Sequence, residues 1–185
     1  MLRKNTLSRK DRYTAGDGLW RLGCVVALLI VGWYTIDYLL LDAKWGLIDG
    51  ANFVIHESGH SLFGWLGQTL GMLGGTLAQI LVPLGCALYF WTRHQRFAAS
   101  VCGWWLGQSL LNVSVYIDDA VVMALPLFGG GVHDWNYLLG TWQLLHRANE
   151  LASAVRIIGS LLMLAGLGYA VYCIRKGPKY GSVNG

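Results

Sequence analysis

The sequence predicts an all-α integral membrane protein built as a single domain. Of its 185 residues, 55% are hydrophobic and only 13% are Asp, Glu, Lys or Arg, about half the charged share of a soluble domain. The mean hydropathy of +0.45 excludes an intrinsically disordered chain. The basic residues gather at the two ends of the chain. Such clusters indicate membrane orientation and contact with anionic lipid, so we expect no nucleic-acid partner.

Four apolar runs predict firm transmembrane helices, because a spanning helix needs about 20 mainly apolar residues. These runs cover residues 19–41, 70–91, 97–117 and 151–174. The second and third contain no Asp, Glu, Lys or Arg at all. The single charge within the fourth, Arg156, is close enough to the helix end to reach the interface.

Two further segments, 45–65 and 120–145, are apolar overall but less regular. The first carries polar and charged residues at Asp49, Asn52, His56, Glu57 and His60. The second breaks at Pro126 and at the three glycines 129–131. Non-helical backbone at membrane depth is tolerated only where it is buried in protein or lines a wet cavity. We therefore expect both segments to be re-entrant or interfacial and to surround a functional site.

The terminal charges also limit the topology. Basic ends place a short N-terminal segment, 1–18, and a tail, 176–185, in the cytoplasm, on either side of a transmembrane domain at 19–175. Two cytoplasmic termini require an even number of crossings. Four crossings place the basic loop 92–96 inside as well, whereas six would place it outside, so we favour four. We expect the protein to lie in a bacterial inner membrane.

The motif that carries chemistry is an HExxH at residues 56–60. Histidines four apart on a helix project from one face, so His56 and His60 can hold one metal ion while Glu57 reaches a water on that ion. Random placement of five His and two Glu would produce the motif with a probability of roughly 0.1–0.2%. An unpaired carboxylate in an apolar segment is also costly. Both arguments favour a zinc site over a chance arrangement.

A catalytic zinc usually has three protein ligands, so a third one is required. Six residues are candidates for it: Asp118, Asp119, His133, Asp134 and, less plausibly, His94 and His146. Negative charge at the carboxyl end of a helix opposes its dipole, so a cation near Asp119 would relieve a cost. His133 follows a flexible glycine turn, with Asp134 as a candidate hydrogen-bond partner. We expect Asp119 or His133 to be the third ligand, and both to lie at or next to the ion.

A membrane-embedded HExxH followed by an aspartate after an intervening span resembles the site-2 protease family of intramembrane zinc metallopeptidases. The resemblance extends over residues 48–120. It implies His56 and His60 as zinc ligands and Glu57 as the catalytic base. It further implies Asp119, or its neighbour Asp118, as the third ligand.

The chain also departs from that family. The family's Asn-Pro-Asp-Gly or Leu-Asp-Gly motif is replaced by Tyr-Ile-Asp-Asp-Ala at 116–120, and an Ile-Asp-Gly at 48–50 precedes the HExxH instead of following it. We therefore keep two functional hypotheses. The first is a zinc metallopeptidase that cleaves a membrane-embedded peptide. The alternative is a non-catalytic accessory or assembly subunit of a larger membrane complex, with a structural or vestigial metal.

Two weaker patterns predict packing between helices. The glycine-rich stretches at 71–76 and 103–107 are typical of close contacts between membrane helices. Gln108 and Asn112 are four residues apart and predict an interhelical hydrogen-bond pair.

Overall fold

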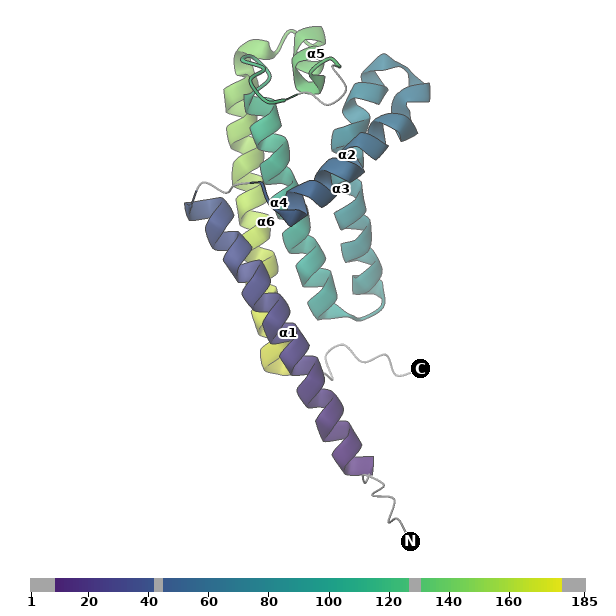
Figure 1. The fold of residues 1–185 in the computed structure, drawn as a ribbon, viewed down its shortest axis with the longest axis vertical. Coiled ribbons are helices and arrows are strands. Elements are labelled where there is room, and N and C mark those ends of the chain that lie inside the picture. The colour runs from purple at the N-terminus through teal and green to yellow at the C-terminus, as the bar shows by residue number, and fades with distance from the viewer. Residues whose placement is uncertain (1–8, 42–44, 127–130, 178–185) are drawn as a thin grey trace.

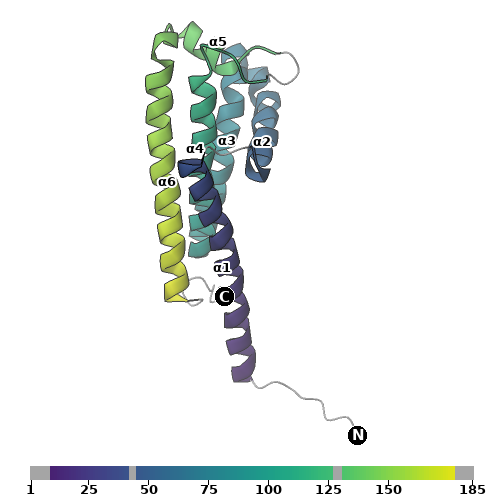
Figure 2. The same ribbon diagram turned by 60° about the vertical axis from the view of Figure 1, so that its left-hand side comes forward.

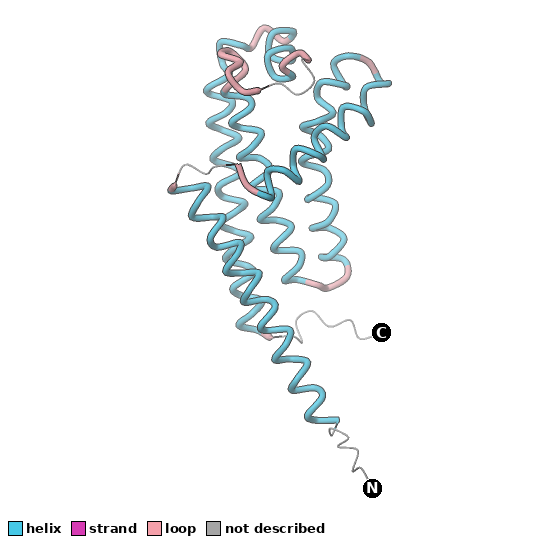
Figure 3. The backbone as a smooth tube through the Cα atoms, viewed as in Figure 1, coloured by secondary structure: helices cyan, strands magenta, loops and turns pink. Residues whose placement is uncertain are grey.

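The computed structural model describes residues 9–41, 45–126 and 131–177. These ranges are helical and contain no strand, as Figure 3 shows, which confirms the all-α class. The glycines at 129 and 130 of the expected break lie outside the described residues. The elements are α1 (Arg9–Leu40), α2 (Leu47–Phe63), η1 (Gly64–Leu66), α3 (Gln68–Thr92), α4 (Arg96–Asp118), α5 (Asp134–Thr141), η3 (Leu145–Arg147) and α6 (Ala148–Lys176).

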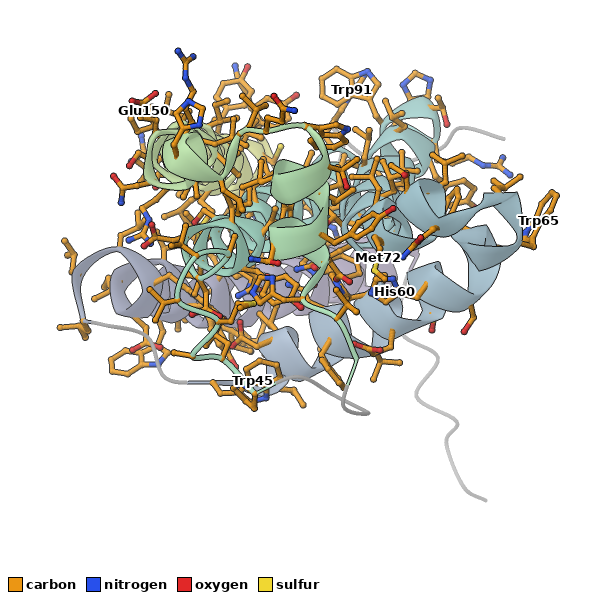
Figure 4. All side chains as sticks on the ribbon, turned by 90° about the horizontal axis from the view of Figure 1, so that it is seen from above. Trp45, His60, Trp65, Met72, Trp91 and Glu150 are labelled. Atoms are coloured by element: carbon orange, nitrogen blue, oxygen red, sulfur yellow. The ribbon has the colours of Figure 1, made fainter. Side chains whose placement is uncertain are left out.

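The helices α1, α3, α4 and α6 run along the long axis of the molecule and alternate in direction (Figures 1 and 2). The start of α1, the turn between α3 and α4 and the end of α6 all point to one end of the bundle, and α5 lies at the other. Figure 4 shows Trp45, Trp65 and Trp91 projecting outward from this bundle. The apolar surface therefore faces outward, as expected in lipid.

Three of these helices are long and apolar enough to cross a membrane: Asp17–Leu40, Gln68–Thr92 and Leu145–Lys176. The remaining predicted span, 97–117, corresponds to α4, which has 23 residues but is not among them. Its hydropathy is lowered by polar side chains such as Gln108 and Ser109, both with no exposed surface. The residues that make α4 less apolar are thus the ones that it packs against α2.

The pair α4 and α6 packs through small residues. A Cβ at Gly107 would lie 2.6 Å from the carbonyl oxygen of Gly159, and one at Gly166 would lie 2.7 Å from the backbone nitrogen of Trp104. Neither position has room for a side chain, which allows the two backbones to approach closely. The prediction of a small-residue contact is confirmed at Gly107, whereas Gly103 has open space around it.

Helices α2 and α3 form a tight hairpin. A Cβ at Gly59 would lie 2.2 Å from the carbonyl oxygen of Gly74, which fixes the point where the two helices touch. The segment around the HExxH was expected to be irregular, but α2 is a continuous helix of 17 residues. Its polar residues do not break it because they line one buried face, which satisfies their hydrogen bonds.

The first half of that buried face binds the middle of α4. Asp49 accepts hydrogen bonds from Nε2 of Gln108 (3.0 Å), from Nδ2 of Asn112 (2.8 Å) and from the hydroxyl of Tyr38. The amide of Asn52 donates to Oε1 of Gln108 (2.6 Å) and to Oδ1 of Asn112 (2.7 Å). The predicted interhelical hydrogen bonds of Gln108 and Asn112 are confirmed by these contacts, and Nε2 of Gln108 also donates to Oδ1 of Asn112 within α4 (3.0 Å). This network holds the start of α2 halfway along the bundle.

Candidate metal centre

The two imidazoles of the HExxH motif lie on the buried side of α2, with ring centroids 4.8 Å apart. Nδ1 of His60 is 2.7 Å from the carbonyl oxygen of Gly71, and Nδ1 of His56 is 3.1 Å from Oε1 of Gln79. A carbonyl oxygen only accepts hydrogen bonds, so each Nδ1 carries a proton. In the neutral rings, Nε2 is then the nitrogen with the free lone pair, as in most metal-binding histidines.

The orientation of Gln79 is itself fixed. Its Nε2 donates to the backbone oxygen of Ser109 at 3.4 Å, which leaves Oε1 to face His56. Glycine at position 75 gives the His56 ring its space, because a Cβ there would lie 2.5 Å from Nε2. Helix α3 therefore positions the His56 ring in two ways. Gln79 accepts its Nδ1 proton, and Gly75 leaves room for the ring.

Both Nε2 atoms meet the same carboxylate oxygen. Oδ2 of Asp134 lies 3.0 Å from Nε2 of His56 and 3.2 Å from Nε2 of His60. Desolvation by burial would raise the pKa of the Asp134 carboxyl, but the hydrogen bonds to His56 and His60 outweigh it and lower that pKa. The hydrogen bond to Asp134 also raises the pKa of His60 to about 9. A proton on each Nε2 atom, or a metal ion bound by all three atoms, accounts for these distances.

The three atoms suit a divalent ion. Ligands at about 2.0–2.1 Å from a tetrahedral zinc lie about 3.3 Å apart, close to the two Nε2–Oδ2 distances of 3.0 and 3.2 Å. Two imidazoles and a carboxylate form a ligand set that zinc favours and that leaves a fourth position open. The His60 side chain, labelled in Figure 4, is 27% exposed, so the site is open to one side.

Glu57 completes the group from the same helix. It offers a carboxylate oxygen that lies within 4.8 Å of a ring nitrogen of His56 and of His60. The side chain is half-buried, so it is accessible from the site without being locked into the packing. A carboxylate at this place can accept a proton from a water molecule bound beside the imidazoles.

The structure places Asp119 and His133 beside each other and not against the two imidazoles. Nε2 of His133 is 3.3 Å from Oδ2 of Asp119, but the two atoms are not aligned as a hydrogen bond. Nδ1 of His133 accepts from the backbone N–H of Asn136 and caps the start of α5. The residue that meets both imidazoles is thus Asp134, and not Asp119 or His133, which the sequence favoured.

Asp119 and His133 nevertheless contribute to the site. The Asp119 carboxylate accepts from the backbone N–H groups of Ala124 (2.8 Å) and Leu125 (3.0 Å), which shapes the chain after α4. Because His133 caps α5, it determines where the first residue of that helix, Asp134, points. The neighbouring Asp118 instead accepts from Asn149 at an exposed position.

Comparisons of the chain with protein-family models, with curated proteins and with solved structures found no match. The geometry described above is therefore the basis for assigning a function.

Proposed function

We propose that the protein is a zinc-dependent intramembrane metallopeptidase. The observation that carries this proposal is the convergence of His56, His60 and Asp134, whose Nε2 and Oδ2 atoms lie 3.0 and 3.2 Å apart and could bind one ion. The HExxH in a membrane segment and its resemblance to site-2 proteases support the same function. An ion bound there would lower the pKa of a coordinated water towards 7 and polarise a substrate carbonyl.

The side chains of the chain have distinct roles in this proposal. Asp134, His56 and His60 would hold the ion. Glu57 removes a proton from the attacking water and delivers it to the nitrogen of the leaving amine. Water adds to the carbonyl carbon and the C–N bond breaks, so the products are a carboxylate and an amine.

The proposed membrane arrangement has four crossings, with α4 as the fourth. Helix α4 has no Asp, Glu, Lys or Arg between residues 97 and 117, and it packs between α3 and α6, which are apolar enough to cross. The basic turn at 93–96 then lies at the same end as the start of α1 and the end of α6. That end is cytoplasmic by its charge. Helix α2 enters from one side without crossing.

The test uses cells that produce either the wild-type protein or the Glu57→Gln variant. New N-termini of membrane proteins are quantified by mass spectrometry, and metal content and thermal unfolding are measured on the detergent-purified proteins. We expect Glu57→Gln to keep the metal and the fold but to lose the new N-termini. Glu150→Gln changes the chain's other glutamate and serves as the matched control.

Two outcomes would replace this proposal. Identical cleavage by the wild type and Glu57→Gln would exclude Glu57 as the catalytic base. The metal would be structural if Glu57→Gln kept the protein's function and His56→Ala prevented it from folding. The chain would then be an accessory subunit of a membrane complex.

A further inference from the structure

Tyr116 is a polar residue beside the metal centre that the proposed mechanism does not use. It lies on α4, four residues after Asn112, on the face that packs against α2. Its ring contacts His56 edge-on at a centroid distance of 5.8 Å and lies against His133 at 4.2 Å. The side chain is half-buried. Tyr116 therefore forms a wall of the site between the HExxH helix and the loop before α5.

The hydroxyl of Tyr116 lies beside the candidate metal centre. It is near the backbone N–H of Asp134 and within electrostatic reach of the Glu57 carboxylate. A half-buried hydroxyl whose ring contacts His56 is suited to donate a hydrogen bond to an oxygen of a ligand.

We propose that the Tyr116 hydroxyl donates a hydrogen bond to the carbonyl oxygen of the peptide bond under attack. This inference rests on the proposed peptidase function. When water adds to the carbonyl carbon, negative charge develops on that oxygen, and a preorganised donor stabilises it more than it stabilises the substrate. The phenolic proton stays on Tyr116 throughout, so the proton balance of the reaction still runs through Glu57.

His133 is the other polar ring near this position, but it is not available for this task. Its side chain has no exposed surface, and its Nδ1 is occupied by the backbone of Asn136. Its Nε2 faces Asp119, and the Tyr116 ring covers it. Tyr116 is thus the residue of this pair that a substrate can reach.

The test compares Tyr116→Phe, which removes only the hydroxyl, with the control Tyr137→Phe, whose hydroxyl lies 3.5 Å from Oγ1 of Thr69 in α3. Kinetics use a membrane peptide whose cleavage depends on Glu57. We expect Tyr116→Phe to lower kcat about 100-fold, with KM and zinc affinity within about twofold of wild type. The control should match the wild type in all three quantities.

A second measurement does not depend on turnover. Acetohydroxamate presents two oxygens to a metal ion, and its binding to the cobalt-loaded protein is followed by visible absorption. We expect Tyr116→Phe to weaken this binding about tenfold, because one hydrogen bond to a charged ligand is lost. Tyr137→Phe should leave the dissociation constant unchanged.

The outcomes separate this inference from the proposed function. If Tyr116→Phe keeps both kcat and the acetohydroxamate affinity while Glu57→Gln abolishes cleavage, the inference is wrong and the function stands. If Tyr116→Phe loses zinc, Tyr116 supports Asp134 structurally and the inference is also wrong. If the wild type cleaves no peptide, the proposed function is wrong. Weaker acetohydroxamate binding by Tyr116→Phe would then still show that the Tyr116 hydroxyl contacts a ligand of the metal.

Discussion

Oδ2 of Asp134 lies 3.0 Å from Nε2 of His56, although the two residues are 78 positions apart in the chain. The same oxygen is 3.2 Å from Nε2 of His60. This contact joins the α2–α3 hairpin to α5, two parts of the bundle that Figure 1 shows next to each other at its upper end. A metal ion bound there would connect the same two parts more strongly than the present hydrogen bonds do.

Removal of Asp134 should abolish tight metal binding. In Asp134→Ala the two imidazoles remain, but the anionic ligand is lost, so we expect zinc affinity to fall by more than about 100-fold. The measurement is a zinc titration of the purified protein against a fluorescent chelator. Asp118→Ala is the control, because Asp118 is exposed and its hydrogen bond among the described residues is to Asn149. Equal affinities of the two variants would exclude Asp134 as a ligand.

A methyl group at position 75 should displace the His56 ring. In Gly75→Ala the new Cβ would lie 2.5 Å from Nε2 of His56, so the ring must move. We expect zinc affinity to fall about 10- to 100-fold, with the helical circular-dichroism signal unchanged. Gly85→Ala lies on the same helix with nothing within 4 Å of the added atom. Normal zinc binding by Gly75→Ala would mean that His56 is not a ligand.

Gln79 should raise the zinc affinity of the site by fixing the tautomer of His56. In Gln79→Ala the acceptor for the Nδ1 proton is lost, so the ring is less firmly held with Nε2 towards the ion. We expect a 10- to 100-fold loss of zinc affinity, measured as for Asp134. Gln68→Ala changes an exposed glutamine at the start of the same helix and should have no effect. A loss of equal size in both variants would contradict the assigned role.

Asp49 should determine stability and not chemistry. In Asp49→Asn an amide replaces the carboxylate that accepts hydrogen bonds from Tyr38, Gln108 and Asn112. The new amide N–H groups would then face N–H or O–H groups that have lost their acceptor. We expect the free energy of unfolding to fall by about 2–4 kcal/mol, measured by unfolding in mixed micelles. Asp17→Asn, at an exposed position of α1, is the control. Unchanged stability of Asp49→Asn would show that this network does not anchor α2.

The long helices could be predicted because uninterrupted apolar runs leave a chain in lipid few alternatives to a helix. The predicted run 97–117 agrees with α4 (Arg96–Asp118), and 70–91 agrees with α3 (Gln68–Thr92). The polar residues around the HExxH predict an irregular segment, because polar groups within an apolar run are expected where the backbone lines a site. In the structure these residues, Asp49 and Asn52 among them, find partners on α4, so the helix is regular.

The third acceptor of the site could not be chosen from the sequence. His133 and Asp134 are adjacent, and their side chains point in different directions at the start of α5. The cap at His133 decides which one faces the imidazoles, since its Nδ1 binds the backbone of Asn136. Histidine is not among the preferred N-cap residues, so the sequence carries no capping signal here. Only the fold of the chain after α4 brings Asp134 to the HExxH helix.

The most direct test of this account is X-ray absorption at the zinc edge of the detergent-purified protein, together with its metal content. We expect one zinc ion per chain, with two imidazole ligands and the remaining positions filled by oxygen at about 2.0–2.2 Å. The imidazole signal should disappear when both His56 and His60 are replaced by Ala. A protein without stoichiometric metal, or a zinc ion bound by sulfur or retained by the double variant, would contradict the account.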